Sequence, residues 1–84
     1  MTEPTTVIEK TRPFILETFY LPDGTVGDDA PLFSSGLLDS ADLVTLLMFL
    51  EEEFGISIDG PDVTIDRFDT LRAMSEYVSA AGAK

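Results

Sequence analysis

The stretch GLLDSADLVTLLMFLEEEFG, residues 36–55, decides the fold because it holds the longest uninterrupted apolar-periodic segment of the chain. Its apolar residues recur at the i, i+3, i+4, i+7 spacing that places side chains on one face of a helix. The residues predicted to form this buried seam are Leu43, Leu46, Leu47, Leu50 and Phe54. The sequence therefore predicts an amphipathic helix with Asp39 and Ser40 at its N-terminus and Gly55 as its C-cap.

A second group of side chains lies on or beside the opposite face of this predicted helix: Ala41, Val44, Thr45, Met48, Glu51 and Glu52. Val44 and Met48 are thus apolar residues predicted to face solvent. In an arbitrary helix a second apolar stripe is more often additional core. Here the acids interleaved with it could be buried only with partners, and the chain has only five basic residues. We interpret this face as a docking surface.

The composition of the chain excludes several classes of site and partner. A chain of 84 residues forms one small domain that buries only about 60–65 % of its unfolded surface, so its core is thin. The absence of cysteine and histidine removes disulfides, thiol chemistry, the common metal ligands and the usual general base. The net charge of −11 repels nucleic acid and anionic membranes and favours partners with basic patches. We therefore expect no metal site and no nucleic-acid partner.

The hydropathy pattern indicates a folded domain outside the membrane. Hydrophobic residues make up 44 % of the chain and charged ones 25 %, which is too apolar for a disordered acidic tail. No run reaches the roughly 18 apolar residues that a membrane span needs, and the polar start Met1–Pro4 does not resemble a signal peptide. We expect a cytoplasmic, monomeric protein.

The remaining chain predicts further helices separated by one long loop. Residues 5–20 have a helical pattern interrupted by Pro13, which indicates either one kinked helix or a helix that starts at Arg12–Pro13. Residues 21–38 have no period and are rich in turn residues, with apolar side chains available to pin the loop: Leu32, Phe33, Leu37 and Leu38. Residues 62–68 predict a helical turn or two, followed by a last helix for which Asp69 and Thr70 offer an N-cap.

Ser40 is the candidate for chemistry. A serine at the first helical position lies beside free backbone N–H groups and the positive end of the helix dipole, which suits a covalently attached phosphate. Taken alone, Asp39-Ser40 is more simply explained as a good N-cap pair. Nucleophilic catalysis is weaker still, because no histidine or suitably placed lysine can activate Ser40.

Residues 39–55 resemble the second helix of the acyl and peptidyl carrier proteins, which share an Asp-Ser start, an Asp two residues after the Ser and a Leu-Glu-Glu-Glu-Phe-type ending. The flanking chain agrees, with a Phe-x-Thr-Leu opening of the last helix at residues 68–71. The resemblance implies an all-α four-helix bundle over residues 1–84, with an ordered core at about 5–81. It would have three main helices, a short third helix and a long loop between the first two.

The resemblance also implies the function. Ser40, with Asp39 as the motif residue and cap, would carry covalent 4′-phosphopantetheine whose thiol holds acyl or aminoacyl groups as thioesters. A phosphopantetheinyl transferase, an acyl- or aminoacyl-loading enzyme and downstream synthase or tailoring enzymes would be the partners. They would bind the surface that includes Ala41, Asp42, Val44, Thr45, Met48, Glu51 and Glu52, and the carrier itself would not be an enzyme.

Two departures from the carrier pattern concern the pathway. Ala41 stands where carriers mostly have Leu, Met or Ile, and Thr45 where fatty-acid carriers commonly have Glu. The Gly36–Asp39 spacing is one residue longer than in fatty-acid synthase carriers, and it resembles D-alanyl carriers and free-standing carriers of polyketide and nonribosomal peptide pathways. The resemblance therefore favours a specialised pathway. The alternatives are an acidic, non-catalytic interaction module in which Ser40 is only a cap and, more remotely, a small hydrolase.

Overall fold

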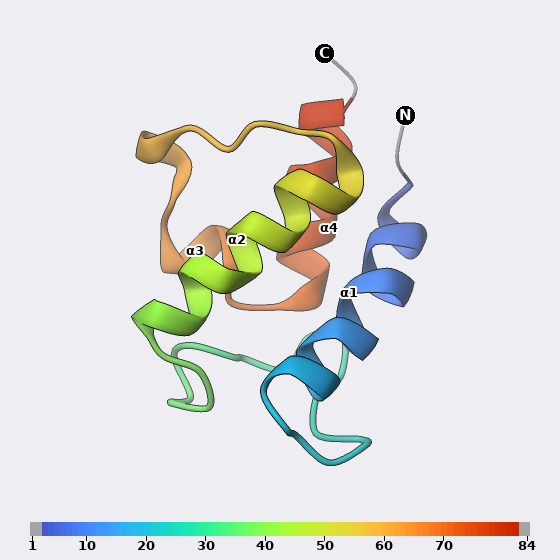
Figure 1. Cartoon of the computed structure of the whole chain (residues 1–84), viewed down its shortest axis with the longest axis vertical. Helices are drawn as coiled ribbons and strands as arrows, with labels where there is room; N and C mark the ends of the chain where they lie inside the picture. The colour runs from blue at the N-terminus through green and yellow to red at the C-terminus, as the bar shows by residue number, and fades with distance from the viewer. Residues whose placement is uncertain (1–2, 83–84) are drawn as a thin grey trace.

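The structure is a computed structural model that describes residues 3–82. Over that range the chain consists of helices and loops without a strand (Figure 1). The elements in chain order are α1 (Pro4–Thr18), α2 (Ser40–Phe54), the short 3-10 helix η1 (Gly60–Asp62), α3 (Ile65–Phe68) and α4 (Leu71–Gly82). This confirms the predicted bundle of three main helices with a short third helix and a long loop after the first. Residues 1–2 and 83–84 of the predicted domain lie outside the described range.

Helix α1 runs through its internal proline. It begins at Pro4, one residue before the predicted start, and Pro13 lies inside it, so the alternative start at Arg12–Pro13 is wrong. Pro13 is exposed and the carbonyl that it leaves unbonded belongs to Glu9, which is also exposed, so water can replace the missing bond. The helix ends at Thr18 rather than Tyr20 because Tyr20 has left-handed backbone.

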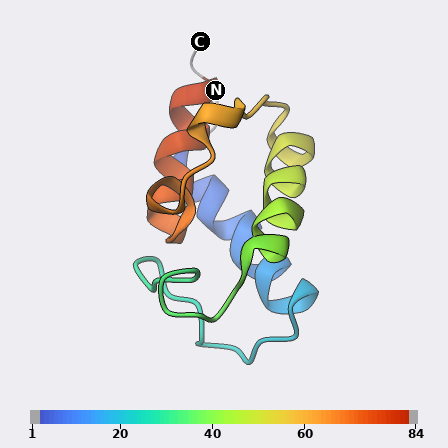
Figure 2. The ribbon, with the colours of Figure 1, turned by 90° about the vertical axis from the view of Figure 1, so that its left-hand side faces the viewer.

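The core is a single apolar cluster between the three main helices. Helix α1 packs along α4, and both α3 and α2 also contact α4, so α4 is the common neighbour (Figures 1 and 2). The buried apolar side chains are Val7, Ile15, Val26, Leu32, Leu38, Leu43, Leu46, Leu50, Phe68, Leu71, Met74 and Val78. The Cα radius of gyration of 11.7 Å is close to the roughly 12 Å expected for a compact chain of this length.

Aromatic side chains join α1 to α2. The rings of Phe14 and Phe49 are stacked, with centroids 3.9 Å apart, and Phe49 also meets Phe54 edge-on at 6.3 Å. Phe54 and Leu47 were predicted to be buried in the α2 seam, but both are only half-buried. The seam is therefore narrower than predicted, and its fully enclosed part is Leu43, Leu46 and Leu50.

The long loop between α1 and α2 is held to the bundle by apolar side chains. Leu32 and Leu38 are buried as predicted and Phe33 is half-buried, whereas Leu37 is exposed. Val26 is a further buried anchor that the sequence pattern did not indicate. The loop thus contributes to the core, which explains how so small a domain tolerates a long connection.

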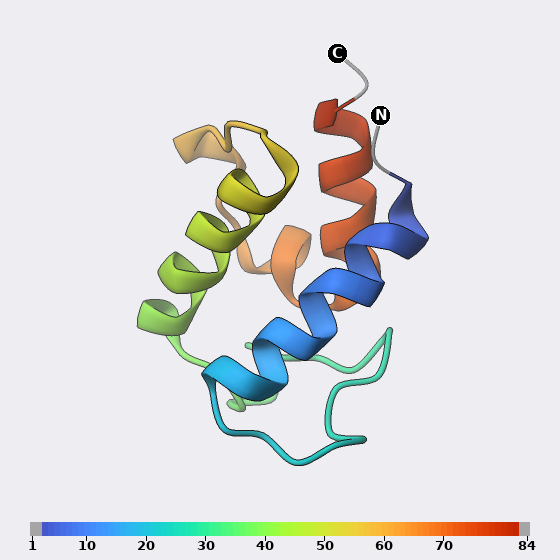
Figure 3. The ribbon, with the colours of Figure 1, turned by 45° about the vertical axis from the view of Figure 1, so that its right-hand side comes forward.

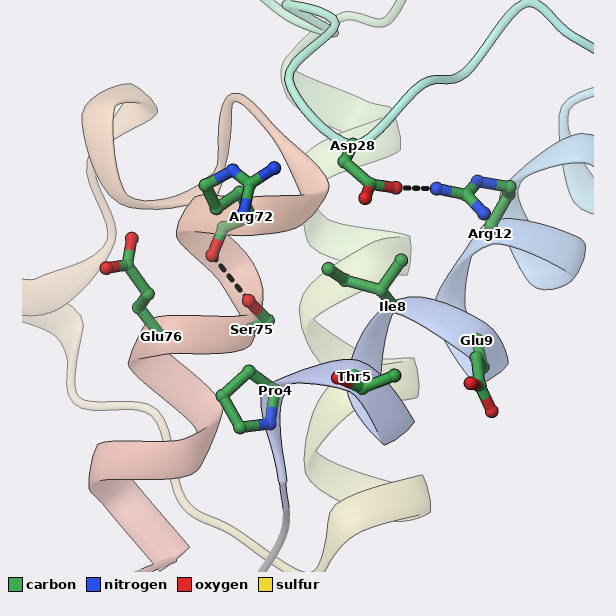
Figure 4. A pocket seen from close by; sticks show the side chains of 9 residues that line it. All are labelled: Pro4, Thr5, Ile8, Glu9, Arg12, Asp28, Arg72, Ser75 and Glu76. Atoms are coloured by element: carbon green, nitrogen blue, oxygen red, sulfur yellow. Dashed lines mark hydrogen bonds and ion pairs between the residues drawn. The ribbon is translucent and has the colours of Figure 1, made fainter.

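Two arginines also hold the middle of this loop. The Arg12 side chain of α1 donates to the Val26 carbonyl at 2.9 Å. It also pairs with Asp28, and Figure 4 shows this pair. From α4, the backbone N–H of Arg72 donates to the Asp28 carbonyl at 3.0 Å, and its guanidinium makes two bonds to Asp29. The hydrogen bonds from the Arg72 guanidinium, together with its positive charge, lower the pKa of Asp29. The loop is therefore fastened to α1 and α4 together.

Asp69 fastens the second half of the loop. Its carboxylate accepts the backbone N–H groups of Phe33 and Ser34, at 2.7 and 3.0 Å, and the Ser34 hydroxyl at 2.6 Å. Desolvation opposes ionisation of this carboxyl, but the bonds from Ser34 and Phe33 outweigh it and the pKa of Asp69 is lowered. The cap of α4 is Thr70 instead, whose hydroxyl accepts the Ala73 N–H at 3.0 Å. Of the two predicted capping residues, only Thr70 caps.

Candidate functional site

Ser40 is the first residue of α2, and its side chain is exposed. Asp39 is the N-cap, in extended backbone, and its carboxylate accepts the N–H of Asp42 at 3.0 Å. Asp42 returns the bond, because its carboxylate accepts the Asp39 N–H at 3.0 Å. This reciprocal capping box fixes where the helix starts and hence where Ser40 lies.

The capping box leaves donors at the helix end. Asp42 N–H is taken by the Asp39 side chain and Leu43 N–H by the Asp39 carbonyl. The N–H groups of Ser40 and Ala41 have no acceptor among residues 3–82. They lie at the positive end of a helix of fifteen residues. An ester phosphate on the Ser40 oxygen fits this end of α2, since it would lie beside both donors.

Hydrogen bonds connect this helix start to α4. The Leu32 N–H donates to the Asp69 carbonyl at 2.7 Å, and the Leu38 N–H donates to the Leu32 carbonyl at 2.8 Å. Leu38 is buried and directly precedes the N-cap Asp39. The turn over residues 32–38 is therefore closed on itself and tied to the start of α4, and it sets the entry of the chain into α2.

The predicted docking face is exposed over most of its length. Val44 and Met48 have 57 % and 60 % of their surface exposed, which confirms that these two apolar side chains face solvent. Ala41, Thr45 and Glu52 are exposed as well. This face of α2 therefore combines exposed apolar side chains with an exposed carboxylate.

The other two acids of the predicted site are partly engaged inside the molecule. Asp42 is half-buried in the capping box. Glu51 is half-buried, and its carboxylate accepts the Ile58 N–H at 2.9 Å, which holds the chain beyond α2. Both therefore have structural bonds, and Glu52 is the freer carboxylate of the face.

A shallow hollow borders this face on the side of α1. It has a volume of about 340 Å³, and its lining residues are Phe14, Thr45, Met48, Phe49 and Glu52. Phe14 and Phe49 were not predicted as site residues. The periodicity of a single helix cannot show that these two rings stack between α1 and α2. Their aromatic character is the one signal in the sequence that could have drawn attention to them.

Residues 3–82 contain no group of three or more acidic side chains placed to hold a metal ion. None of the helices in this range is both long and apolar enough to span a membrane.

Comparison with known proteins places the chain in a family. The family model described as the phosphopantetheine attachment site matches residues 12–78, which is most of the chain. The chain therefore belongs to the phosphopantetheine-attachment family. It is also 29 % identical over 72 residues to an acyl carrier protein of Thermotoga maritima, a match that covers 86 % of each chain.

Family membership fixes the general biochemistry. The covalently attached cofactor is 4′-phosphopantetheine. It supplies the reactive thiol, so the lack of cysteine and histidine in the chain is no obstacle. Proteins of this kind interact with a phosphopantetheinyl transferase, which attaches the cofactor, and carry intermediates for synthase enzymes. They do not catalyse reactions themselves, so the chain is a carrier and not an enzyme.

Proposed function

We propose that Ser40 is the residue that carries 4′-phosphopantetheine and that the arm holds acyl or aminoacyl intermediates as thioesters for a specialised biosynthetic pathway. The observation that carries the proposal is the start of α2, where an exposed serine hydroxyl lies next to two unbonded backbone donors. Asp39 acts as the cap that fixes the helix start, and it does not need to touch the cofactor.

The electrostatics of the helix end favour attachment there. The partial positive charge at the N-terminus of α2 offsets part of the negative charge of the phosphodiester. Asp39 and Asp42 are close by, but each spends a carboxylate oxygen on a backbone N–H of the capping box. Ser40 therefore offers a better environment for an anion than the exposed serines of the loop, Ser34 and Ser35, whose hydroxyls are already bonded to Asp69 and Pro31.

The partners in this proposal are a phosphopantetheinyl transferase, an enzyme that loads the acyl or aminoacyl group, and downstream synthase or tailoring enzymes. They would meet the exposed face of α2 at Ala41, Val44, Thr45, Met48 and Glu52. Asp42 and Glu51 belong to the same proposed surface but would contribute charge mainly, because their side chains have intramolecular bonds. A net charge of −11 would steer such partners through basic patches.

The proposed class of pathway rests on the residues that directly precede Ser40 in the sequence. Two leucines separate Gly36 from Asp39, and in the fold Leu38 enters the core while Leu37 remains on the surface. This spacing, with Ala41 and Thr45 on the docking face, supports a free-standing carrier of a polyketide or nonribosomal peptide pathway or a D-alanyl carrier. The mass of the species loaded on the protein in its native host would distinguish acyl from aminoacyl cargo.

The attachment is tested with the whole chain, coenzyme A, Mg²⁺ and a broad-specificity phosphopantetheinyl transferase. The intact mass should rise by one phosphopantetheine, and Ser40→Ala should show no gain. Ser57→Ala is the matched control, since it removes an exposed hydroxyl beyond the far end of α2 and should be modified like the parent. Modification of Ser40→Ala would overturn the assignment. An unmodified parent would instead favour an acidic interaction module.

A further inference from the structure

Tyr20 has a backbone conformation that its side chain disfavours. Its φ is +56°, in the left-handed region that bulky residues rarely adopt. It follows the C-cap Phe19, and beyond it the Leu21 N–H donates to the Leu16 carbonyl at 2.9 Å, which closes the end of α1. Helices that end in this way usually have glycine, or sometimes asparagine, at the left-handed position.

The fold gains no packing from the Tyr20 side chain. The residue is 93 % exposed, the most exposed large apolar or aromatic residue of the described chain. Within residues 3–82 its hydroxyl makes no hydrogen bond and its ring has no aromatic neighbour. A glycine would make the same helix end with less strain, so stability alone does not account for tyrosine here.

Tyr20 lies toward the end of the molecule where α2 begins. The C-terminal end of α1 and the N-terminal end of α2 are at the same end of the bundle in all three ribbon views (Figures 1, 2 and 3). Tyr20 directly follows α1, and Ser40 is the first residue of α2. An enzyme that reaches Ser40 therefore approaches the end of the molecule that presents Tyr20.

The surroundings of Tyr20 favour a cationic contact. Glu17 and Asp23, three residues away on either side, are exposed carboxylates. They line a shallow hollow of about 420 Å³ together with Pro13, the apolar side chains of Leu16 and Leu21, and Arg12, whose guanidinium is already paired with Asp28. Exposed carboxylates and apolar side chains within four residues of an exposed phenol ring suit the charge and alkyl chain of an arginine or lysine.

We propose that Tyr20 is a contact residue for enzymes that act at Ser40, and that its ring takes an arginine or lysine side chain of the enzyme. The inference rests on the proposed attachment at Ser40. It adds the C-terminal end of α1 to the contact surface, apart from the face of α2. Tyrosine is among the residues that contribute most to binding when they are placed centrally in an interface.

The test compares Tyr20→Gly and Tyr20→Phe with the parent, using the full chain, coenzyme A and a phosphopantetheinyl transferase. Tyr20→Gly should raise the melting temperature by about 2–6 °C, because it relieves the left-handed strain. It should also lower kcat/KM for modification about 5–10-fold, with kcat unchanged, since a binding contact is lost. Tyr20→Phe keeps the ring and should retain most of the parental kcat/KM. Lys10→Gln, exposed in the first half of α1, is the control and should retain it too.

Each other result overturns the inference. A parental kcat/KM in Tyr20→Gly would show that the ring makes no contact, and a lower melting temperature would show that the ring supports the fold. Equal losses in Tyr20→Phe and Tyr20→Gly would exclude the ring-face contact. A parent dimer that Tyr20→Gly dissociates in sedimentation would assign the surface to a second copy of the chain. Failure of the parent to be modified would remove the proposed function itself, and the inference with it.

Discussion

The two faces of α2 should respond oppositely to truncation. Leu46 has no exposed surface and lies in the part of the seam that is fully enclosed. Leucine-to-alanine changes at such sites cost about 2–5 kcal/mol, through lost transfer free energy and the cavity that remains. Met48, two residues on, has 60 % of its surface exposed, and its truncation should change stability by only about 0.5 kcal/mol or less.

The loss at Leu46 is large for this domain. A chain of this size has a total free energy of unfolding of roughly 4–13 kcal/mol, at about 0.05–0.15 kcal/mol per residue. With a urea m value of about 1.5 kcal/mol/M, a loss of about 3 kcal/mol lowers the unfolding midpoint by about 2 M. Urea titrations followed by far-UV circular dichroism measure both variants. Equal midpoints for Leu46→Ala and Met48→Ala, or a larger loss for Met48→Ala, would refute the assignment of core and docking face.

Three further outcomes are expected. Because the pKa values of Asp69 and Asp29 are lowered, their stabilisation is complete above the ordinary carboxyl pKa of 3.8 and is lost as the pH falls through the lowered values. Asp69→Asn should therefore flatten the acid limb of a stability profile, and an unchanged limb would show that Asp69 does not contribute. The net charge of −11 makes the chain repel itself, so about 0.5 M NaCl should raise the melting temperature. A fall would contradict this and show that the Arg12 and Arg72 ion pairs matter more than the repulsion. Glu52→Lys should slow association with a partner enzyme at low salt while leaving the unfolding midpoint unchanged, and parental association rates would move the recognition surface elsewhere.

Periodicity predicted the elements of this fold well, because its signal is strongest where helices are amphipathic. The seam of Leu43, Leu46 and Leu50 and the exposure of Val44 and Met48 follow from the 100° turn per residue. The left-handed C-cap at Gly55 follows from the freedom of glycine. These features depend on neighbours within one or two helical turns.

What the sequence did not predict depends on contacts between distant segments. Asp69 looked like a capping residue, but the approach of the loop makes its carboxylate an acceptor for Phe33 and Ser34. Burial of Val26 depends on where the loop passes, and periodicity carries no information about a loop. The start of α1 also depended on context, because an internal proline is tolerated when the freed carbonyl faces solvent.

In the candidate site, too, the local features were predictable and the features that depend on side-chain geometry were not. The capping role of Asp39 was predicted from the residue type at a helix start, and the structure confirms it. The reciprocal bond from Asp42 and the bond from Ile58 to Glu51 were not predicted, since both depend on side-chain geometry. Attachment at Ser40 and the role of the α2 face remain predictions.

The central claim is that Ser40 carries the phosphopantetheine, and peptide mapping of the modified protein tests it most directly. The transferase-treated chain is digested, and tandem mass spectrometry locates the added group by its fragment ions. We expect the whole modification on Ser40 and none on the other serines, Ser34, Ser35, Ser57, Ser75 and Ser79. Fragments that place the group on another residue would contradict the account of how this carrier works.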